Sequence, residues 1–126
     1  MQDFRRLRVW NDSVALAAAV YAATEHLPPS ERYGLRAQIR SAAVSVSSNI
    51  AEGCGRPGPR DMARFLGIAI GSACEVESQV YVINRLGLLD TDATTELLES
   101  VDTLKRRLIS LHGRVVKARP KASGAG

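Results

Sequence analysis

Four segments of this chain repeat aliphatic residues at steps of three and four, the period of an α-helix with one buried side. Prolines and glycines separate the segments. Only 5% of the 126 residues are aromatic, so alanine, leucine, isoleucine and valine must fill the core. No segment shows the two-residue period of a half-buried strand. The pattern predicts an all-α fold, an antiparallel up-down-up-down four-helix bundle.

The predicted helices cover residues 9–26, 31–52 and 59–86, with a fourth that begins at an Asp90 or Thr91 cap. Ser30 is the predicted N-cap of the second helix, and Gly53 follows its end in the position that favours glycine. Pro59 suits the first position of the third helix. The predicted buried stripes are, in chain order, Trp10, Val14, Ala17 or Ala18 and Tyr21; Leu35, Ile39, Ala42, Ala43, Val46 and Ile50; Met62, Phe65, Leu66, Ala69, Ala73, Val76, Val80 and Ile83; and Leu97, Val101, Leu104, Leu108, Leu111 and Val115.

Residues 1–118 are predicted to form the bundle domain, and residues 119–126 a disordered basic tail. The N-terminal arginines before an alanine-rich run resemble a signal peptide, but polar residues enter that run, so an amphipathic helix is favoured. No stretch approaches the roughly 20 apolar residues that span a membrane. Cys54 and Cys74 form no metal or redox motif, which indicates free thiols in the cytoplasm.

Facing positions on antiparallel second and third helices should have residue numbers that sum to about 113. This register places Ala42 and Ala43 level with Gly71, where small residues let the backbones approach. It also predicts interhelical ion pairs. The predicted neighbours are Arg36 with Glu77, Arg40 with Glu75 or Glu77, and Glu52 with Arg60 or Asp61.

Two sequence blocks carry a family resemblance. YGLRAQIRSAAVSVSSNIAEG (33–53) and RFLGIAIGSACEVESQV (64–80), with LRVW (7–10) and RLGLL (85–89), resemble the four-helix bundle proteins related to those encoded in 23S ribosomal RNA intervening sequences. The positions that match the family pattern, to which we assign structural roles, are Arg40, Asn49, Glu52, Gly53, Gly71, Ser72, Glu75 and Glu77. Ser41, Ser47 and Ala73 depart from it, and Ser41 removes a basic charge.

The resemblance implies a closed bundle that assembles as a homopentamer. It also implies kinship with the accessory variability protein of diversity-generating retroelements, a basic pentamer that binds nucleic acid and a reverse transcriptase. An independent hint of self-assembly is the apolar surplus outside the predicted stripes. That surplus consists of Leu16, Val20, Val44, Ile68, Ile70 and Leu98.

No constellation for catalysis, no metal site and no cofactor site is found in the sequence. His26 and His112 are isolated near predicted helix ends. Glu75 and Glu77 point about 200° apart around a helix, so they cannot act together as an acid and base. Asn49 and Ser72 are expected to form hydrogen bonds at a helix end, between helices or in a polar network at a subunit contact.

Basic residues are expected to gather at one end of the bundle, here called the basic pole. In this topology the start of the first helix, the second turn and the end of the fourth helix lie together. The predicted pole consists of Arg5, Arg6, Arg8, Arg56, Arg60, Arg64, Arg106, Arg107, Arg114 and Lys117, followed by Arg119 and Lys121 of the tail. Its predicted acids are Asp3, Asp12, Glu52 and Asp61.

The sequence thus predicts a non-enzymatic, self-assembling bundle protein that binds RNA or DNA at the basic pole without sequence preference. A pentamer is the first expectation and a dimer the second. One alternative is a structural or protein interaction module without a nucleic-acid role, in which the basic tail only aids solubility. An enzyme with a pocket between subunits is a third class that no residue pattern supports.

Overall fold

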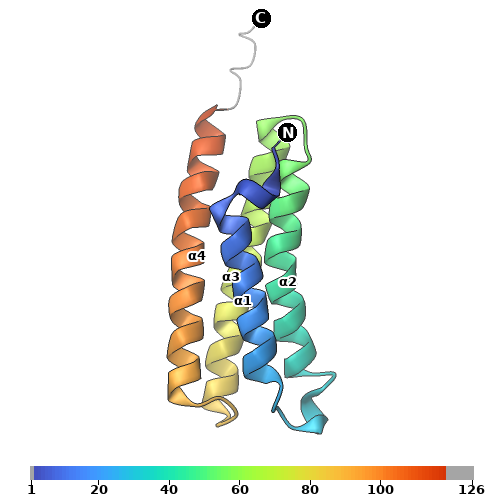
Figure 1. Ribbon diagram of the computed structural model, residues 1–126, viewed down its shortest axis with the longest axis vertical. Helices are drawn as coiled ribbons and strands as arrows, with labels where there is room; N and C mark the ends of the chain where they lie inside the picture. The colour runs from blue at the N-terminus through green and yellow to red at the C-terminus, as the bar shows by residue number, and fades with distance from the viewer. Residues whose placement is uncertain (1, 119–126) are drawn as a thin grey trace, which may run out of the picture.

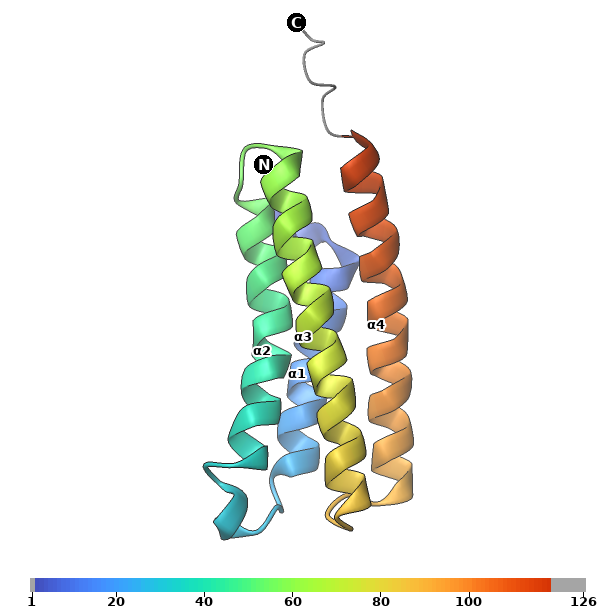
Figure 2. The same ribbon diagram turned by 180° about the vertical axis from the view of Figure 1, so that it is seen from behind.

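The computed structural model describes residues 2–118, and the predicted tail at 119–126, with Arg119 and Lys121, lies outside the described residues. Four helices lie side by side and antiparallel in a closed bundle (Figures 1 and 2). Their bounds are α1 (Arg8–Thr24), α2 (Leu35–Cys54), α3 (Pro59–Arg85) and α4 (Thr91–Ala118), with 3-10 turns η1 (Phe4–Arg6) and η2 (Pro29–Glu31). The predicted all-α, up-down-up-down four-helix bundle is confirmed.

Local chemistry explains most of the helix ends. Pro59 opens α3, where its missing N–H leaves no hydrogen bond unmade. Gly87, with a φ of 76°, ends the same helix, because a left-handed residue there lets the next N–H groups reach back to free carbonyls. Asp90 caps α4, since its Oδ1 accepts a 2.7 Å hydrogen bond from the Ala93 N–H.

Two predictions about the ends of the second helix are wrong. Ser30 lies inside η2 and does not cap α2, which begins at Leu35. Glu31 acts there instead, because its Oε1 accepts a 3.3 Å hydrogen bond from the Leu35 N–H. Gly53 does not follow α2 but lies within its last turn, buried against α3.

The core confirms the predicted stripes of α2, α3 and α4. Most of their residues are buried, whereas Phe65 and the outer positions Leu35, Met62, Leu111 and Val115 are half-buried. The fully enclosed side chains on these helices include Ile39, Val46, Ile50, Leu66, Val76, Val80, Ile83, Val101, Leu104 and Leu108. Aliphatic residues therefore fill the interior, as the low aromatic content requires.

The predicted stripe of the first helix is wrong at Val14 and Tyr21, whereas its members Trp10 and Ala17 are half-buried and pack against the core. α1 buries the adjacent face that contains Val9, Ser13, Leu16, Val20 and Thr24, while Val14 and Tyr21 are 41% and 45% exposed. The two hydroxyl groups on this face can be buried because both are hydrogen-bonded. Ser13 Oγ donates to the Trp10 carbonyl, and Thr24 Oγ1 donates to the Val20 carbonyl. Leu16 and Val20 are thus core residues rather than apolar surplus.

The observed contact between α2 and α3 departs from the predicted register. Ser45 Oγ and Ser72 Oγ lie 3.0 Å apart across the two helices, so contacting residue numbers sum to 117. Side chains lean toward the N-terminus of their own helix, which raises this sum for antiparallel partners. Gly71 is exposed, and an added Cβ there would meet nothing within 4 Å, so the predicted close approach at Gly71 is wrong.

α3 combines a length of 27 residues with an apolar composition. Among the described helices it is the one that passes a membrane-span test by length and composition, with a mean hydropathy of 1.2. The core helix of a bundle passes the same test, and the apolar side of α3 is buried against the other helices. Core packing therefore accounts for part of its apolar character, whereas Ile68, Tyr81 and Val82 of the same helix are exposed.

Candidate nucleic-acid interface

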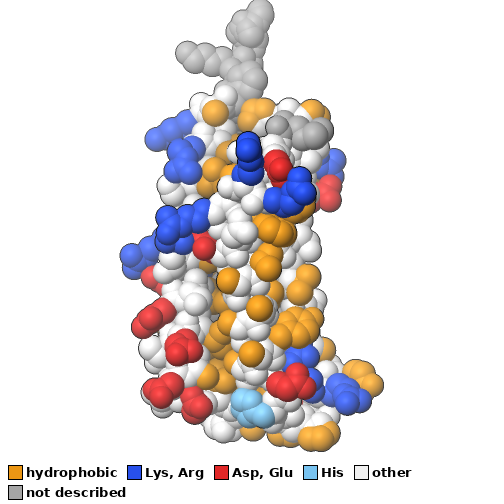
Figure 3. All heavy atoms as spheres, in the orientation of Figure 1, with side chains coloured by type: hydrophobic (Ala, Val, Ile, Leu, Met, Phe, Trp, Pro, Cys, Tyr) orange, Lys and Arg blue, Asp and Glu red, His pale blue; other side chains and the backbone are white. Residues whose placement is uncertain are grey.

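The topology gathers the predicted basic residues at one end of the bundle. The N-terminal turn, the α2–α3 connection and the end of α4 lie together in Figure 1. Lys and Arg side chains dominate the upper half of the face shown in Figure 3, whereas acidic side chains line the lower part of α4. The molecule is therefore electrically polarised along its long axis on this face.

Ion pairs neutralise half of the basic pole. Arg107 and Asp12 form the shortest of them, with Nη1 and Oδ2 2.6 Å apart, and they connect α4 to α1. The others are Arg5 with Asp3, Arg56 with Glu52, Arg64 with Asp61, and Arg106 with Asp102. Asp102 was missed in the sequence, although its i,i+4 spacing to Arg106 is the signal for such a pair.

The pair at the N-terminal turn also carries a pKa change. Arg5 donates two side-chain hydrogen bonds to the Asp3 carboxylate, which lowers the pKa of Asp3 and raises that of Arg5. Asp3 therefore stays ionised, and it also accepts a hydrogen bond from the Arg5 N–H as the cap of η1. The positive and negative charges of this pair cancel, so the pair adds little net charge to the basic pole.

Five basic side chains of the pole form no ion pair with any other described residue. Each of them is exposed, so water or a ligand has access to its charge. They are Arg6, Arg8, Arg60, Arg114 and Lys117. The uncompensated charge comes from three segments of the chain, the N-terminal turn with α1, the start of α3 and the end of α4.

A groove of about 250 Å³ runs between the start of α1 and the last turns of α4. Arg8, Arg107 and Arg114 line it, together with Ser110, and Arg114 Nη1 donates to Ser110 Oγ over 2.9 Å. No side chain caps the first turn of α1, which adds free N–H groups and the positive end of the helix dipole. Arg107 and Arg114 are two turns apart on one face, the signal that could have revealed this groove.

Two further arginines of the pole are committed to packing. The guanidinium carbons of Arg56 and Arg64 lie 4.8 and 4.5 Å from the centre of the Phe65 ring. Both arginines also form ion pairs, Arg56 with Glu52 at 2.8 Å and Arg64 with Asp61 at 3.8 Å, so their charges are partly balanced within the fold. Their main role at the basic pole is therefore to pack against the Phe65 ring.

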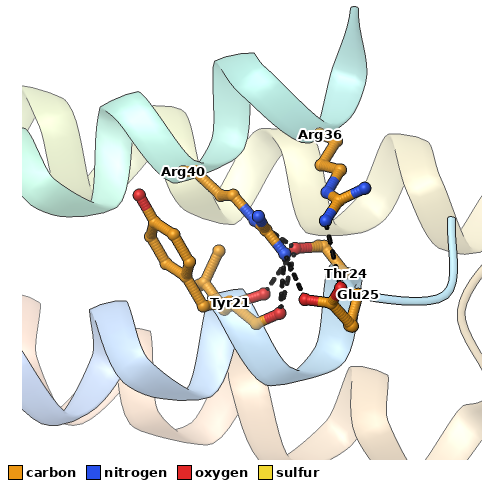
Figure 4. A network of polar contacts seen from close by, with 6 residues as sticks. Tyr21, Thr24, Glu25, Arg36 and Arg40 are labelled. Atoms are coloured by element: carbon orange, nitrogen blue, oxygen red, sulfur yellow. Dashed lines mark hydrogen bonds and ion pairs between the residues drawn. The ribbon is translucent and has the colours of Figure 1, made fainter. Parts of the chain in front are cut away.

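The predicted partners of Arg36 and Arg40 are wrong. Both arginines turn toward α1 rather than α3, where they share the carboxylate of Glu25 at 3.3 and 3.4 Å (Figure 4). Arg40 also donates to the Tyr21 carbonyl over 2.9 Å and to Thr24 Oγ1 over 3.0 Å. The pattern along α2 fixed the spacing of these arginines but not the neighbouring helix that they face.

The predicted acidic partners have other contacts. Glu77 accepts a 2.8 Å hydrogen bond from Lys105 Nζ on α4, which raises the pKa of Lys105. Glu75 accepts from Gln79 within α3, and Glu52 pairs with Arg56 rather than with Arg60.

Asn49 and Ser72 belong to an interhelical polar network. Asn49 Nδ2 donates to the Ser45 carbonyl and to Ser45 Oγ, which lies within hydrogen-bond distance of Ser72 Oγ. The sequence left a helix end, a contact between helices and a subunit contact open for these hydrogen bonds, and the contact between helices is observed. Among residues 2–118, no three His, Cys, Asp or Glu side chains come together as a metal site would require.

These features define a small antiparallel four-helix bundle protein with a charged pole. The model of the 23S rRNA-intervening sequence protein family matches residues 5–110, and the chain belongs to this family. The resemblance inferred from the sequence blocks is thereby confirmed.

A solved structure has a similar fold. It is the crystal structure of a protein with unknown function from the S23 ribosomal protein family of Bacteroides thetaiotaomicron, with a TM-score of 0.77 and 20% identity over 82% of this chain and 97% of that chain. At this identity the likeness concerns the fold alone. A comparison with curated proteins found no match.

Proposed function

We propose that this protein is a non-enzymatic, self-assembling bundle of the cytoplasm that binds RNA or DNA through its basic pole. The observation that carries the proposal is the pair of arginines without an ion-pair partner among the described residues, Arg8 and Arg114, that line the α1–α4 groove beside the paired Arg107. Guanidinium groups bind phosphate oxygens and release counterions, whatever the base sequence. The groove offers no aromatic platform for base stacking, so binding should lack marked sequence preference.

The outward face of α1 supports self-assembly. From Ser13 to Thr24 the helix contains no charged residue, and an apolar stripe follows it along the bundle in Figure 3. The exposed members of this stripe are Val14, Ala15, Ala18, Ala19, Tyr21 and Ala22. An uncharged helix face of this length is typical of a protein contact. The homopentamer implied by the family resemblance is the proposed state, and a dimer is the next.

Binding to labelled RNA and DNA at about 50 mM salt tests the nucleic-acid half, because phosphate contacts are strong there. Arg8→Gln and Arg114→Gln should each weaken binding and lower the slope of log K against log salt by roughly one unit. Arg85→Gln is the matched control, since it removes the same charge from the end of α3 at the opposite pole. It should leave both quantities unchanged.

Light scattering tests the assembly half independently. A monomer at micromolar concentration would remove self-assembly from the proposal. No nucleic-acid binding at about 50 mM salt would instead favour the structural or protein interaction module. In that case a pull-down from native lysate, with and without nuclease, identifies the partner, and a reverse transcriptase is the candidate that the resemblance implies.

A further inference from the structure

A second groove lies between α1 and α2, at the opposite end of the bundle from the basic pole. Its volume is about 410 Å³. We call it the arginine groove. Its lining residues are Tyr21, Arg32, Arg36, Ala37, Arg40 and Ser41. Three of these six side chains are cationic, and none is acidic. The nucleic-acid interface proposed above does not use them.

The charges of the arginine groove are not balanced within the fold. Glu25 is the carboxylate that Arg36 and Arg40 share, and Arg32 forms no ion pair with any other described residue. Two positive charges therefore remain in one small volume. The side chain of Glu25 is 74% exposed, so it is the weakly held member of the cluster.

The fold holds the arginines in place before any ligand arrives. Arg40 is fixed by the Tyr21 carbonyl and Thr24 Oγ1, and its guanidinium lies 4.3 Å from the centre of the Tyr21 ring. Arg36 is 81% enclosed with a single hydrogen bond, to Glu25, and its buried Nε has no partner within the described residues. Such preorganised donors lose little entropy when they bind an anion.

We propose that the arginine groove binds a phosphate group, as a small phosphate monoester or as free inorganic phosphate. A phosphate dianion matches the two uncompensated charges, and its oxygens match the planar guanidinium donors. Ser41 adds a hydroxyl donor on the same rim. The groove is larger than a phosphate, which leaves room for the organic part of an ester.

Glu25 competes with such an anion for the same guanidinium donors (Figure 4). A carboxylate and a phosphate cannot share these donors without repulsion. Removal of the Glu25 charge is therefore expected to strengthen phosphate binding. A cluster that served only as a structural ion-pair network would not respond in this way.

Calorimetric titration with inorganic phosphate, ribose 5-phosphate and AMP at low salt tests the proposal. Glu25→Gln should tighten binding several-fold, and Arg32→Gln should weaken it by roughly tenfold, the usual effect of losing one charge-assisted hydrogen bond. Matched controls are Glu96→Gln and Arg85→Gln, whose residues form no ion pair with other described residues and do not line the groove. Both should bind as the parent does.

The source of the phosphate follows from the three probes. Tighter binding of an ester than of inorganic phosphate assigns a small phosphate monoester, and equal binding assigns free phosphate. No binding at millimolar concentration overturns the proposal, as does an affinity that neither Glu25→Gln nor Arg32→Gln changes. Dissociation of an oligomer by Arg32→Glu without phosphate binding also overturns it, because the groove would then be a contact between copies.

Discussion

Gly53 on α2 and Phe65 on α3 mark a close approach between the two helices. A Cβ added to Gly53 would lie 3.1 Å from the Phe65 Cβ and 3.3 Å from the Met62 carbonyl oxygen. Two of its neighbours are thus backbone or backbone-attached atoms that cannot rotate away. The glycine is needed for this packing and not for a special backbone angle, since it lies within the helix.

The first prediction concerns this contact. Gly53→Ala should lower the free energy of unfolding by about 1–2 kcal/mol, because the cost of overpacking exceeds the gain in helix propensity. Gly71→Ala is the control, since its Cβ would lie in open space on an exposed helix position. It should raise stability by up to about 1 kcal/mol. Urea unfolding measures both, and equal effects of the two substitutions would contradict the close approach.

The second prediction is that Arg40 supports the fold. Arg40→Ala removes hydrogen bonds to Thr24 and Tyr21 and the contact with the Tyr21 ring, so stability should fall by about 2 kcal/mol. Arg40→Lys should recover only part of this loss, because an ammonium cannot reproduce the guanidinium geometry. Thermal unfolding measures the series. Unchanged stability together with lost nucleic-acid binding would assign Arg40 to the binding surface instead.

The third prediction concerns pH and the Lys105–Glu77 pair. Its hydrogen bond raises the pKa of Lys105, so the stabilisation is complete below the ordinary lysine pKa of about 10.4 and is lost as pH rises through the folded value. Lys105→Met should therefore cost about 1 kcal/mol at pH 8 and less at higher pH. Melting temperatures of parent and variant at pH 8 and above about 11 measure the difference. A gap that stays constant with pH would show that packing, not charge, causes the loss.

The fourth prediction concerns the two thiols. Cys54 is 1% exposed, and its burial raises the pKa of the thiol, whereas Cys74 is exposed on α3. At pH 8 a thiol reagent should label Cys74 rapidly and Cys54 only when the bundle opens, because the thiolate is the reactive form. A Cys74→Ser variant should react fully only in denaturant. Rapid labelling of this variant without denaturant would show that the end of α2 opens on its own.

Much of the fold was predictable because it depends on local pattern. The period of aliphatic residues marked all four helices, and Pro59 and Asp90 marked two of their beginnings. The bundle topology then placed the basic residues of three separate segments at one end. These features follow from spacing along the chain and from short connections, so they need no knowledge of the packed core.

The errors concern the rotation of a helix about its own axis. α1 has aliphatic or alanine residues on two adjacent faces, so its pattern did not decide between Val14 and Leu16 as the core residue. Packing of the other three helices made that choice, and the hydroxyls of Ser13 and Thr24 allowed it by bonding to the helix backbone. The prediction for α1 failed because Ser13 and Thr24, which are polar, lie on its buried face.

The amino-acid sequence by itself determined the helices, their order and the charge at each end, because helical period and chain connectivity are local properties. Only the tertiary structure decided that Arg36 and Arg40 share Glu25 on α1, that Gly53 rather than Gly71 allows α3 to approach, and that half of the basic pole is neutralised. The physical reason is that contacts between helices depend on rotation and vertical register. All four helices set these two quantities together when they fill one core.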